Sequence, residues 1–233
     1  MKVDKNYCMS SYLCFRYVAD PEIVFKEGVK HDDHIPIPAE DKMPCRSADD
    51  IDQCIKKILK DVDLSKAAIF LSGGMDSAIL ASYMPKGAKA YTARCVAKSA
   101  IDETERAAEY CRVNGLEHII VDVTWEDYLN TMDDLMRRDG SPFIPNEPQA
   151  YVMARRAAAD GVSTIIYGDC ADTEFGGMDK LLSRDWDYAG WIERFTFLDP
   201  RKVLKNPVDV GMVYDRYRVG ENGIDFIKFI SEV

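Results

Sequence analysis

The chain has 233 residues, of which 47% are hydrophobic and 30% are charged, and its formal net charge is -10. This length accommodates one main domain with a sizeable core, and the composition is that of a folded globular protein rather than a disordered chain. The acidic balance argues against a broad nucleic-acid surface, because such a surface needs an excess of Lys and Arg. We therefore expect a small-molecule substrate rather than a nucleic acid.

The N-terminal residues contain lysines and no continuous apolar segment, so we expect neither a signal peptide nor a membrane anchor, and we expect a cytoplasmic location. The seven cysteines are scattered and include no Cys-x-x-Cys pair, which favours reduced thiols over a disulfide framework or a zinc site. The three histidines are too few to indicate a histidine metal cluster.

Residues 1–44 are expected to form a small N-terminal hairpin and an extended connector. Residues 7–18 are rich in aromatic and β-prone side chains, and Ile23, Val24 and Phe25 follow a turn-like Asp-Pro pair. The stretch 31–44 holds three prolines among charged residues, which disfavours a helix there. Residues 45–233 would then form the main domain.

Strands and helices are expected to alternate along that domain. A capping box at Ser47 precedes apolar residues at helical spacing from Ile51 to Leu59, and the apolar run 67–71 predicts a buried strand that ends at a glycine pair. Further helices are predicted at about 77–84, 103–113, 128–136 and 148–158, and further strands at about 88–96, 118–123 and 163–167. This alternation predicts an α/β fold with a doubly wound parallel sheet, helices on both faces and a ligand site at the carboxyl ends of the strands.

The segment Ser72-Gly73-Gly74-Met75-Asp76-Ser77 follows the first of these strands. Two glycines let the backbone bring its N–H groups against an anion, and the two serines add hydroxyl donors. Asp76 would repel a phosphate unless it held Mg²⁺, so the segment predicts a site for ATP phosphates with Mg²⁺. The alternative is an ordinary strand-to-helix turn in which Ser72 caps the helix and Asp76 lies near its N-terminus.

The sequence LSGGMDS, from Leu71 to Ser77, resembles the SGGxDS signature of the PP-loop ATP pyrophosphatases. A second segment, GDCADTEFGG from Gly168 to Gly177, is similar to the G-E-G-x-D-E-x-F-G-G segment of asparagine synthetases. The two segments occur in the family's order, and the resemblance covers roughly residues 47–205. It implies an adenine nucleotide alpha hydrolase-like fold that uses ATP and Mg²⁺.

The resemblance also implies roles for particular residues. The expected catalytic residues are Asp76, Asp169 and Asp172, and Asp76 and Asp172 are expected to hold Mg²⁺. Asp169 aligns with a glutamate that helps the amine attack the acyl-adenylate, and it is one methylene shorter. The residues expected to contact ATP are Leu71, Ser72, Gly73, Gly74, Asp76, Ser77, Ala93 and Gly168.

An asparagine synthetase-like chain is expected to adenylate a carboxylate such as aspartate, release pyrophosphate, and form an amide with ammonia or another amine. The family's N-terminal glutaminase domain carries a cysteine after Met1, where this chain has Lys2, so ammonia would come from solution or from a partner subunit such as a glutaminase. The apolar spacing in residues 224–233 suggests a homodimer or a fragment. Two alternatives remain open: a PP-loop sulfur-transfer enzyme that uses Cys170, and a catalytically silent ATP-binding module.

Overall fold

The computed structural model describes residues 1–31, 38, 40, 43–169, 171, 184–209, 211, 214–226 and 228–229. The chain forms two compact units. The sheet unit comprises Pro36–Thr131 and Pro145–Ala171, and the aromatic unit comprises Met1–Ile35, Met132–Ile144 and Asp172–Val233. The predicted domain boundary after residue 44 stays a prediction, and most of the predicted connector lies outside the described residues. In the described part of the chain, no helix is long and apolar enough to cross a membrane.

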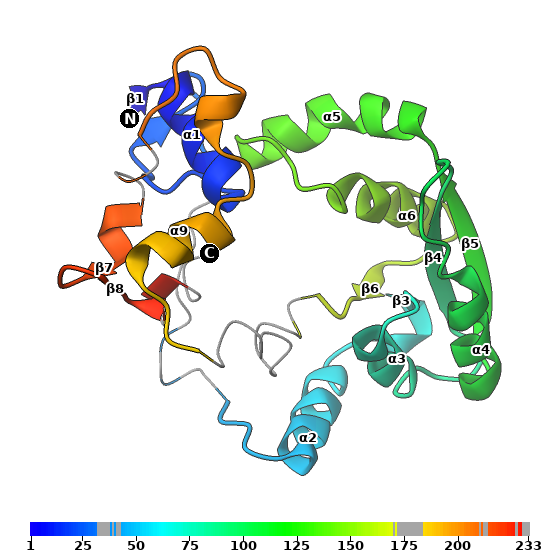
Figure 1. The fold of residues 1–233 in the computed structure, drawn as a ribbon. Helices are drawn as coiled ribbons and strands as arrows, with labels where there is room; N and C mark the ends of the chain where they lie inside the picture. Colours follow the sequence, from blue (N-terminus) through cyan, green and yellow to red (C-terminus); the bar gives the residue numbers. More distant parts are fainter. Residues whose placement is uncertain are drawn as a thin grey trace. The chain divides into compact units, whose positions relative to one another are not determined.

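The sheet unit contains a four-stranded parallel sheet. Its strands are β3 (Ala67–Phe70), β4 (Lys89–Cys95), β5 (Glu117–Val123) and β6 (Thr164–Ile166), in the order β5-β4-β3-β6 (Figure 1). The chain runs outward from β3 through β4 to β5 and then returns to pair β6 with the other side of β3. The direction of winding therefore reverses between β3 and β6, and in open α/β sheets this reversal marks the ligand crevice.

Among the described residues, five α-helices belong wholly or partly to the sheet unit. They are α2 (Ala48–Leu59), α3 (Met75–Ala81), α4 (Thr104–Asn114), α5 (Trp125–Asp139), whose last turns belong to the aromatic unit, and α6 (Glu147–Ala159). A short 3-10 helix, Leu64–Lys66, precedes β3. Local signals fix the ends: Ser47 Oγ accepts a hydrogen bond from the N–H of Asp50 at 3.2 Å, and α4 ends at Gly115 with a φ of 70°. The predicted alternation of strands and helices is confirmed.

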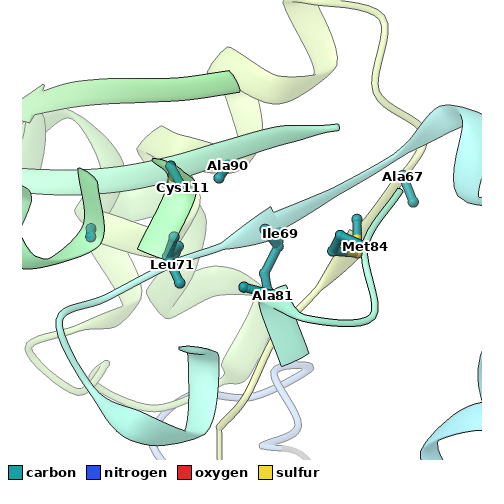
Figure 2. Packing of buried hydrophobic residues seen from close by; sticks show 8 residues of the cluster. Ala67, Ile69, Leu71, Ala81, Met84, Ala90 and Cys111 are labelled. Atoms are coloured by element: carbon teal, nitrogen blue, oxygen red, sulfur yellow. The ribbon is translucent and has the colours of Figure 1, made fainter. Parts of the chain in front are cut away.

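Helices cover both faces of the sheet. Successive residues of a strand point to opposite faces, so alternate strand residues pack against different helices. Ala67, Ile69 and Leu71 pack on one side with residues of α3 and α4, including Ala81 and Cys111 (Figure 2). On the other side, the alternate strand residues pack against α6. The buried members of that second cluster are Ala68, Phe70, Tyr91, Val121, Met153 and Ala157. The predicted doubly wound architecture with helices on both faces is therefore correct.

The aromatic unit has its own core. Its elements are β1 (Lys2–Val3), α1 (Lys5–Phe15), β2 (Ile23–Val24), α9 (Tyr188–Phe195), the 3-10 turns Pro200–Lys202 and Asp215–Tyr217, β7 (Arg218–Val219) and β8 (Gly223–Ile224). Trp191 is fully buried, stacks on Phe195 with ring centroids 4.0 Å apart, and meets the ring of Phe229 edge-on. Phe226 also packs against this core, whereas Ile227 and residues 230–233 lie outside the described residues. The expected homodimer stays a prediction.

The predicted N-terminal hairpin is wrong, because residues 5–15 form α1. The short strands β1 and β2 are parallel, and a parallel pair needs a crossover such as this helix between them. Two serines of α1 are fully buried and hydrogen-bonded: Ser10 Oγ accepts from the N–H of distant Val208, and Ser11 Oγ donates to the carbonyl of nearby Tyr17. The bond to Val208 and the helix cap, in which Asp4 Oδ1 accepts from the N–H of Tyr7, together outweigh the local β-propensity.

Candidate active site

The loop Ser72–Ser77 leaves the carboxyl end of β3 and is closed by its two serines. The N–H of Ser72 donates to Ser77 Oγ at 3.1 Å, and the N–H of Gly74 donates to Ser72 Oγ at 3.0 Å. The two hydroxyl oxygens are 3.0 Å apart. Ser77 is buried and Ser72 is exposed, so the contact between them joins the buried end of the loop to its solvent-exposed end.

Helix α3 begins without a side-chain cap. Its N-cap residue is Gly74, and no described side chain accepts a hydrogen bond from its first turn. The alternative in which Ser72 caps the helix is therefore wrong, since Ser72 Oγ accepts from Gly74 within the loop. The first N–H groups of a helix have no carbonyl partner inside it, and such groups suit an anion.

Gly73 anchors the loop to the start of α4. It is buried, its carbonyl accepts a hydrogen bond from Nη1 of Arg106 at 3.2 Å, and a Cβ placed on it would lie 3.1 Å from Cβ of Glu103. A larger residue at position 73 would therefore crowd the start of α4. Among the residues predicted to contact ATP, Gly73 is the one that does not line the cavity described below.

The second predicted segment begins directly beside the first. A Cβ added to Gly168 would lie 3.3 Å from the backbone nitrogen of Ser77, so this glycine allows the end of β6 to approach the first turn of α3. Asp169 follows it and is exposed. Cys170 and Asp172 lie outside the described residues.

A cavity with a volume of about 220 Å³ opens where these two segments meet. Its lining consists of Phe70, Leu71, Ser72, Gly74, Asp76, Ser77, Ala93, Glu103, Asn146, Gln149, Ala150, Met153, Tyr167, Gly168 and Asp169. The cavity therefore brings together every predicted site residue except Gly73 and Asp172. It lies at the reversal point between β3 and β6, where the topology places a ligand crevice.

One part of the lining is apolar and was not predicted. The rings of Phe70 and Tyr167 meet edge-on with centroids 5.6 Å apart, because β3 and β6 pair in register and place these residues just beyond Ile69 and Ile166. Met153 of α6 lies beside them in the lining. Tyr167 is 48% exposed, which leaves part of its ring accessible. From the sequence, Tyr167 was expected only to end a strand directly before Gly168. That position does not predict where its ring points.

The amide side chains in the lining were also missed. Gln149 Nε2 donates to the hydroxyl of Tyr128 at 2.9 Å, and that hydroxyl donates to the carbonyl of Pro145 at 2.8 Å. Burial raises the pKa of Tyr128, which keeps its hydroxyl protonated for this second bond. These two hydrogen bonds orient Gln149 in the cavity wall. Asn146 lies one turn before Gln149, at the start of α6.

A hydrogen-bond chain across three strands fixes the backbone that leads into the Ser72–Ser77 loop. Thr92 Oγ1 donates to the carbonyl of Leu71 at 2.7 Å, and His118 Nε2 lies 2.9 Å from the same Oγ1. Since the hydroxyl has one proton, His118 must donate through Nε2. Burial lowers the pKa of His118, so the ring is held in its neutral form. Neither residue was singled out from the sequence.

The charge of the lining bears on the predicted metal. Three carboxylates, those of Asp76, Glu103 and Asp169, line the cavity, and its described lining contains no Lys or Arg. A polyphosphate would be repelled there unless a cation lay between, and Mg²⁺ in nucleotide sites is held by one or two carboxylates together with phosphate oxygens. Half-buried Asp76 fits that role. Within the described ranges, no group of three or more His, Cys, Asp or Glu could hold a metal by itself. The pairing of Asp76 with Asp172 stays a prediction.

Comparisons with known proteins give one family. The family model described as asparagine synthase matches residues 48–220. A search of curated proteins finds no match. Among solved structures, an NH3-dependent NAD synthetase from Campylobacter jejuni in complex with the nitrate ion is similar at 16% identity and a TM-score of 0.34. That similarity covers 53% of this chain and 57% of the other, so this chain matches little more than half of that protein.

Proposed function

Since the chain belongs to the asparagine synthase family, a family of ATP-dependent ligases, we propose that it forms an amide from a carboxylate and an amine while ATP is cleaved to AMP and pyrophosphate. The observation that carries this proposal is the cavity in which the Ser72–Ser77 loop and Gly168–Asp169 meet at the carboxyl ends of β3 and β6. Aspartate is the first carboxylate to test, and ammonia is the first amine.

The two halves of the lining suit the two ends of ATP. The apolar half, with Phe70, Met153 and Tyr167, offers ring and thioether surface to a purine. The polar half offers the Ser72 hydroxyl and the uncapped start of α3 to the phosphates. We infer that the base lies toward α6 and that the phosphates lie along the loop.

We assign different roles to the carboxylates, namely metal binding and proton acceptance. We infer that Asp76, with Asp172, would hold Mg²⁺, whose chemistry when bound is to neutralise charge on the pyrophosphate leaving group. Asp169 is an exposed carboxylate of the lining and would accept a proton from the amine as its nitrogen bonds to the acyl carbon and AMP leaves. Its side chain is one methylene shorter than the family's glutamate, so Asp169→Glu should retain or increase amide formation.

The proposal is tested by product analysis of α-labelled ATP incubated with the protein, Mg²⁺, ammonium and a panel of carboxylates led by aspartate. The expected result is AMP whose formation depends on one carboxylate. Asp76→Asn should lower that rate about 100-fold or more. Asp49→Asn, which alters an exposed carboxylate of α2 outside the cavity, should leave it unchanged.

Other results would replace the proposal. Binding of ATP with no AMP in the presence of any carboxylate and amine would identify a catalytically silent module. AMP formation that requires a sulfur donor instead of an amine would identify a sulfur-transfer enzyme.

A further inference from the structure

Two cysteine side chains lie in contact in the sheet unit, outside the cavity. The thiol of Cys45 donates a hydrogen bond to Cys54 Sγ, and the two sulfur atoms are 3.7 Å apart. Cys45 lies just before the N-cap Ser47 of α2, and Cys54 lies on the helix itself. Both side chains are half-buried, so a small oxidant can reach them.

We propose that Cys45 and Cys54 form a redox-active dithiol that closes to an intrachain disulfide when it meets a peroxide. A disulfide has a sulfur–sulfur distance of about 2.05 Å, so the two atoms must approach by roughly 1.7 Å. Cys45 precedes the helix and takes no part in its hydrogen-bond ladder, so rotation of its side chain and a small backbone shift can supply that movement. This inference does not rest on the proposed function.

The reaction balances with hydrogen peroxide as the oxidant. The sulfur of one thiol attacks a peroxide oxygen, the O–O bond breaks, and a sulfenic acid and one water form. The second thiol then attacks the sulfenic sulfur, and a second water leaves as the disulfide forms. Cys45 donates its thiol proton to Cys54 in the hydrogen bond, so in the proposed order Cys54 reacts first and Cys45 resolves it.

Three of the remaining described cysteines are buried more deeply than this pair. Cys8, Cys14 and Cys111 are at most 2% exposed. Burial raises the pKa of Cys8 to about 11 and that of Cys14 to about 12, so their thiolates are scarce near neutrality. Cys95 is half-buried like the proposed pair, and it therefore serves as a matched control.

The bridge would act on a weakly anchored helix. Helix α2 has no buried residue, and it is held by the Ser47 cap and by a hydrogen bond from Tyr83 Oη to Asp52 Oδ1 at 2.7 Å. A covalent link from Cys45 to Cys54 would enclose the cap and the first turns of α2. Oxidation should therefore slow amide exchange in those turns by about ten-fold.

The test uses the full chain, reduced and then treated with hydrogen peroxide, followed by alkylation of free thiols and tryptic mass analysis without reductant. Trypsin cleaves after Lys42, Arg46 and Lys56, so the bridge joins the peptide 43–46 to the peptide 47–56. The expected result is this linked pair, which a dithiol reductant abolishes. It should persist in Cys95→Ser and disappear in Cys45→Ser, where Cys54 should instead be trapped as a sulfenic acid by dimedone.

The proposal is overturned if peroxide yields Cys54 joined to another cysteine, or Cys54 overoxidised without the linked pair. It is equally overturned if both thiols remain alkylatable while the buried cysteines oxidise. Circular dichroism of Cys45→Ser shows whether α2 has formed, and Cys45→Ala provides a second variant if the serine disturbs the cap.

Discussion

Replacing Thr92 with valine tests how the entrance to the Ser72–Ser77 loop is held. Thr92 is 1% exposed, and its hydroxyl both donates to the carbonyl of Leu71 at 2.7 Å and receives the hydrogen bond of His118 at 2.9 Å. Valine has nearly the same shape but makes neither bond. A hydrogen bond contributes about 1 kcal/mol net, so Thr92→Val should lower the free energy of unfolding by about 2 kcal/mol.

The measurement is urea unfolding followed by circular dichroism, with Thr92→Ser as the control. Serine keeps both hydrogen bonds and loses one methyl group, which costs about 1 kcal/mol. Thr92→Val removes the hydrogen-bond donor of the Leu71 carbonyl, and Leu71 directly precedes Ser72. Thr92→Val should therefore also weaken ATP binding more than Thr92→Ser does. If Thr92→Val were as stable as the parent chain, or more stable than Thr92→Ser, the hydrogen-bond chain would have no part in fixing β3.

Three further predictions concern the sheet unit. Burial lowers the pKa of His118 from 6.5, so the unfolded chain takes up this proton first as the pH falls, and the contribution of the neutral ring to stability is lost below about pH 6.5. His118→Gln, which cannot titrate, should lose less stability than the parent between about pH 7 and 5 in urea titrations. Tyr91→Phe removes the hydroxyl of a fully buried ring that donates to Asp160 Oδ2 at 2.9 Å, and it should cost about 1–2 kcal/mol in the same assay. Gly168→Ala places a methyl group 3.3 Å from backbone in the first turn of α3, and it should cost about 1–2 kcal/mol and weaken ATP binding.

Each of these predictions has a discriminating outcome. Equal acid sensitivity of His118→Gln and the parent would show that this ring does not set the pH dependence. An unchanged urea midpoint for Tyr91→Phe would mean that its hydroxyl is equally well solvated in the unfolded chain. For Gly168→Ala the control is Gly190→Ala, whose methyl group would have side-chain atoms of Asp187 as its nearest neighbours, the first at 3.2 Å, rather than backbone. Equal effects of the two alanines would reject the close approach of β6 to α3.

The sequence alone determined the elements of the sheet unit and the two segments that meet at the site. Apolar runs that end in glycine, such as the one leading to Gly73, and helical spacing such as that from Ile51 to Leu59, are encoded within one element. The Ser72–Ser77 loop is likewise encoded locally, because its glycines and serines suit phosphate by residue type alone. Such patterns need no knowledge of distant contacts, because local sterics and the need to bury one face fix them.

The tertiary structure decided what depends on pairing between distant segments. In α1, residues 5–15, the buried Ser10 accepts a hydrogen bond from the N–H of Val208, a contact that no local pattern reveals. The register of β3 against β6 brought Phe70 to Tyr167, and the register of β4 against β5 brought Thr92 to His118. Side chains that meet across strands lie tens of residues apart in sequence, so their contacts exist only after the sheet has formed.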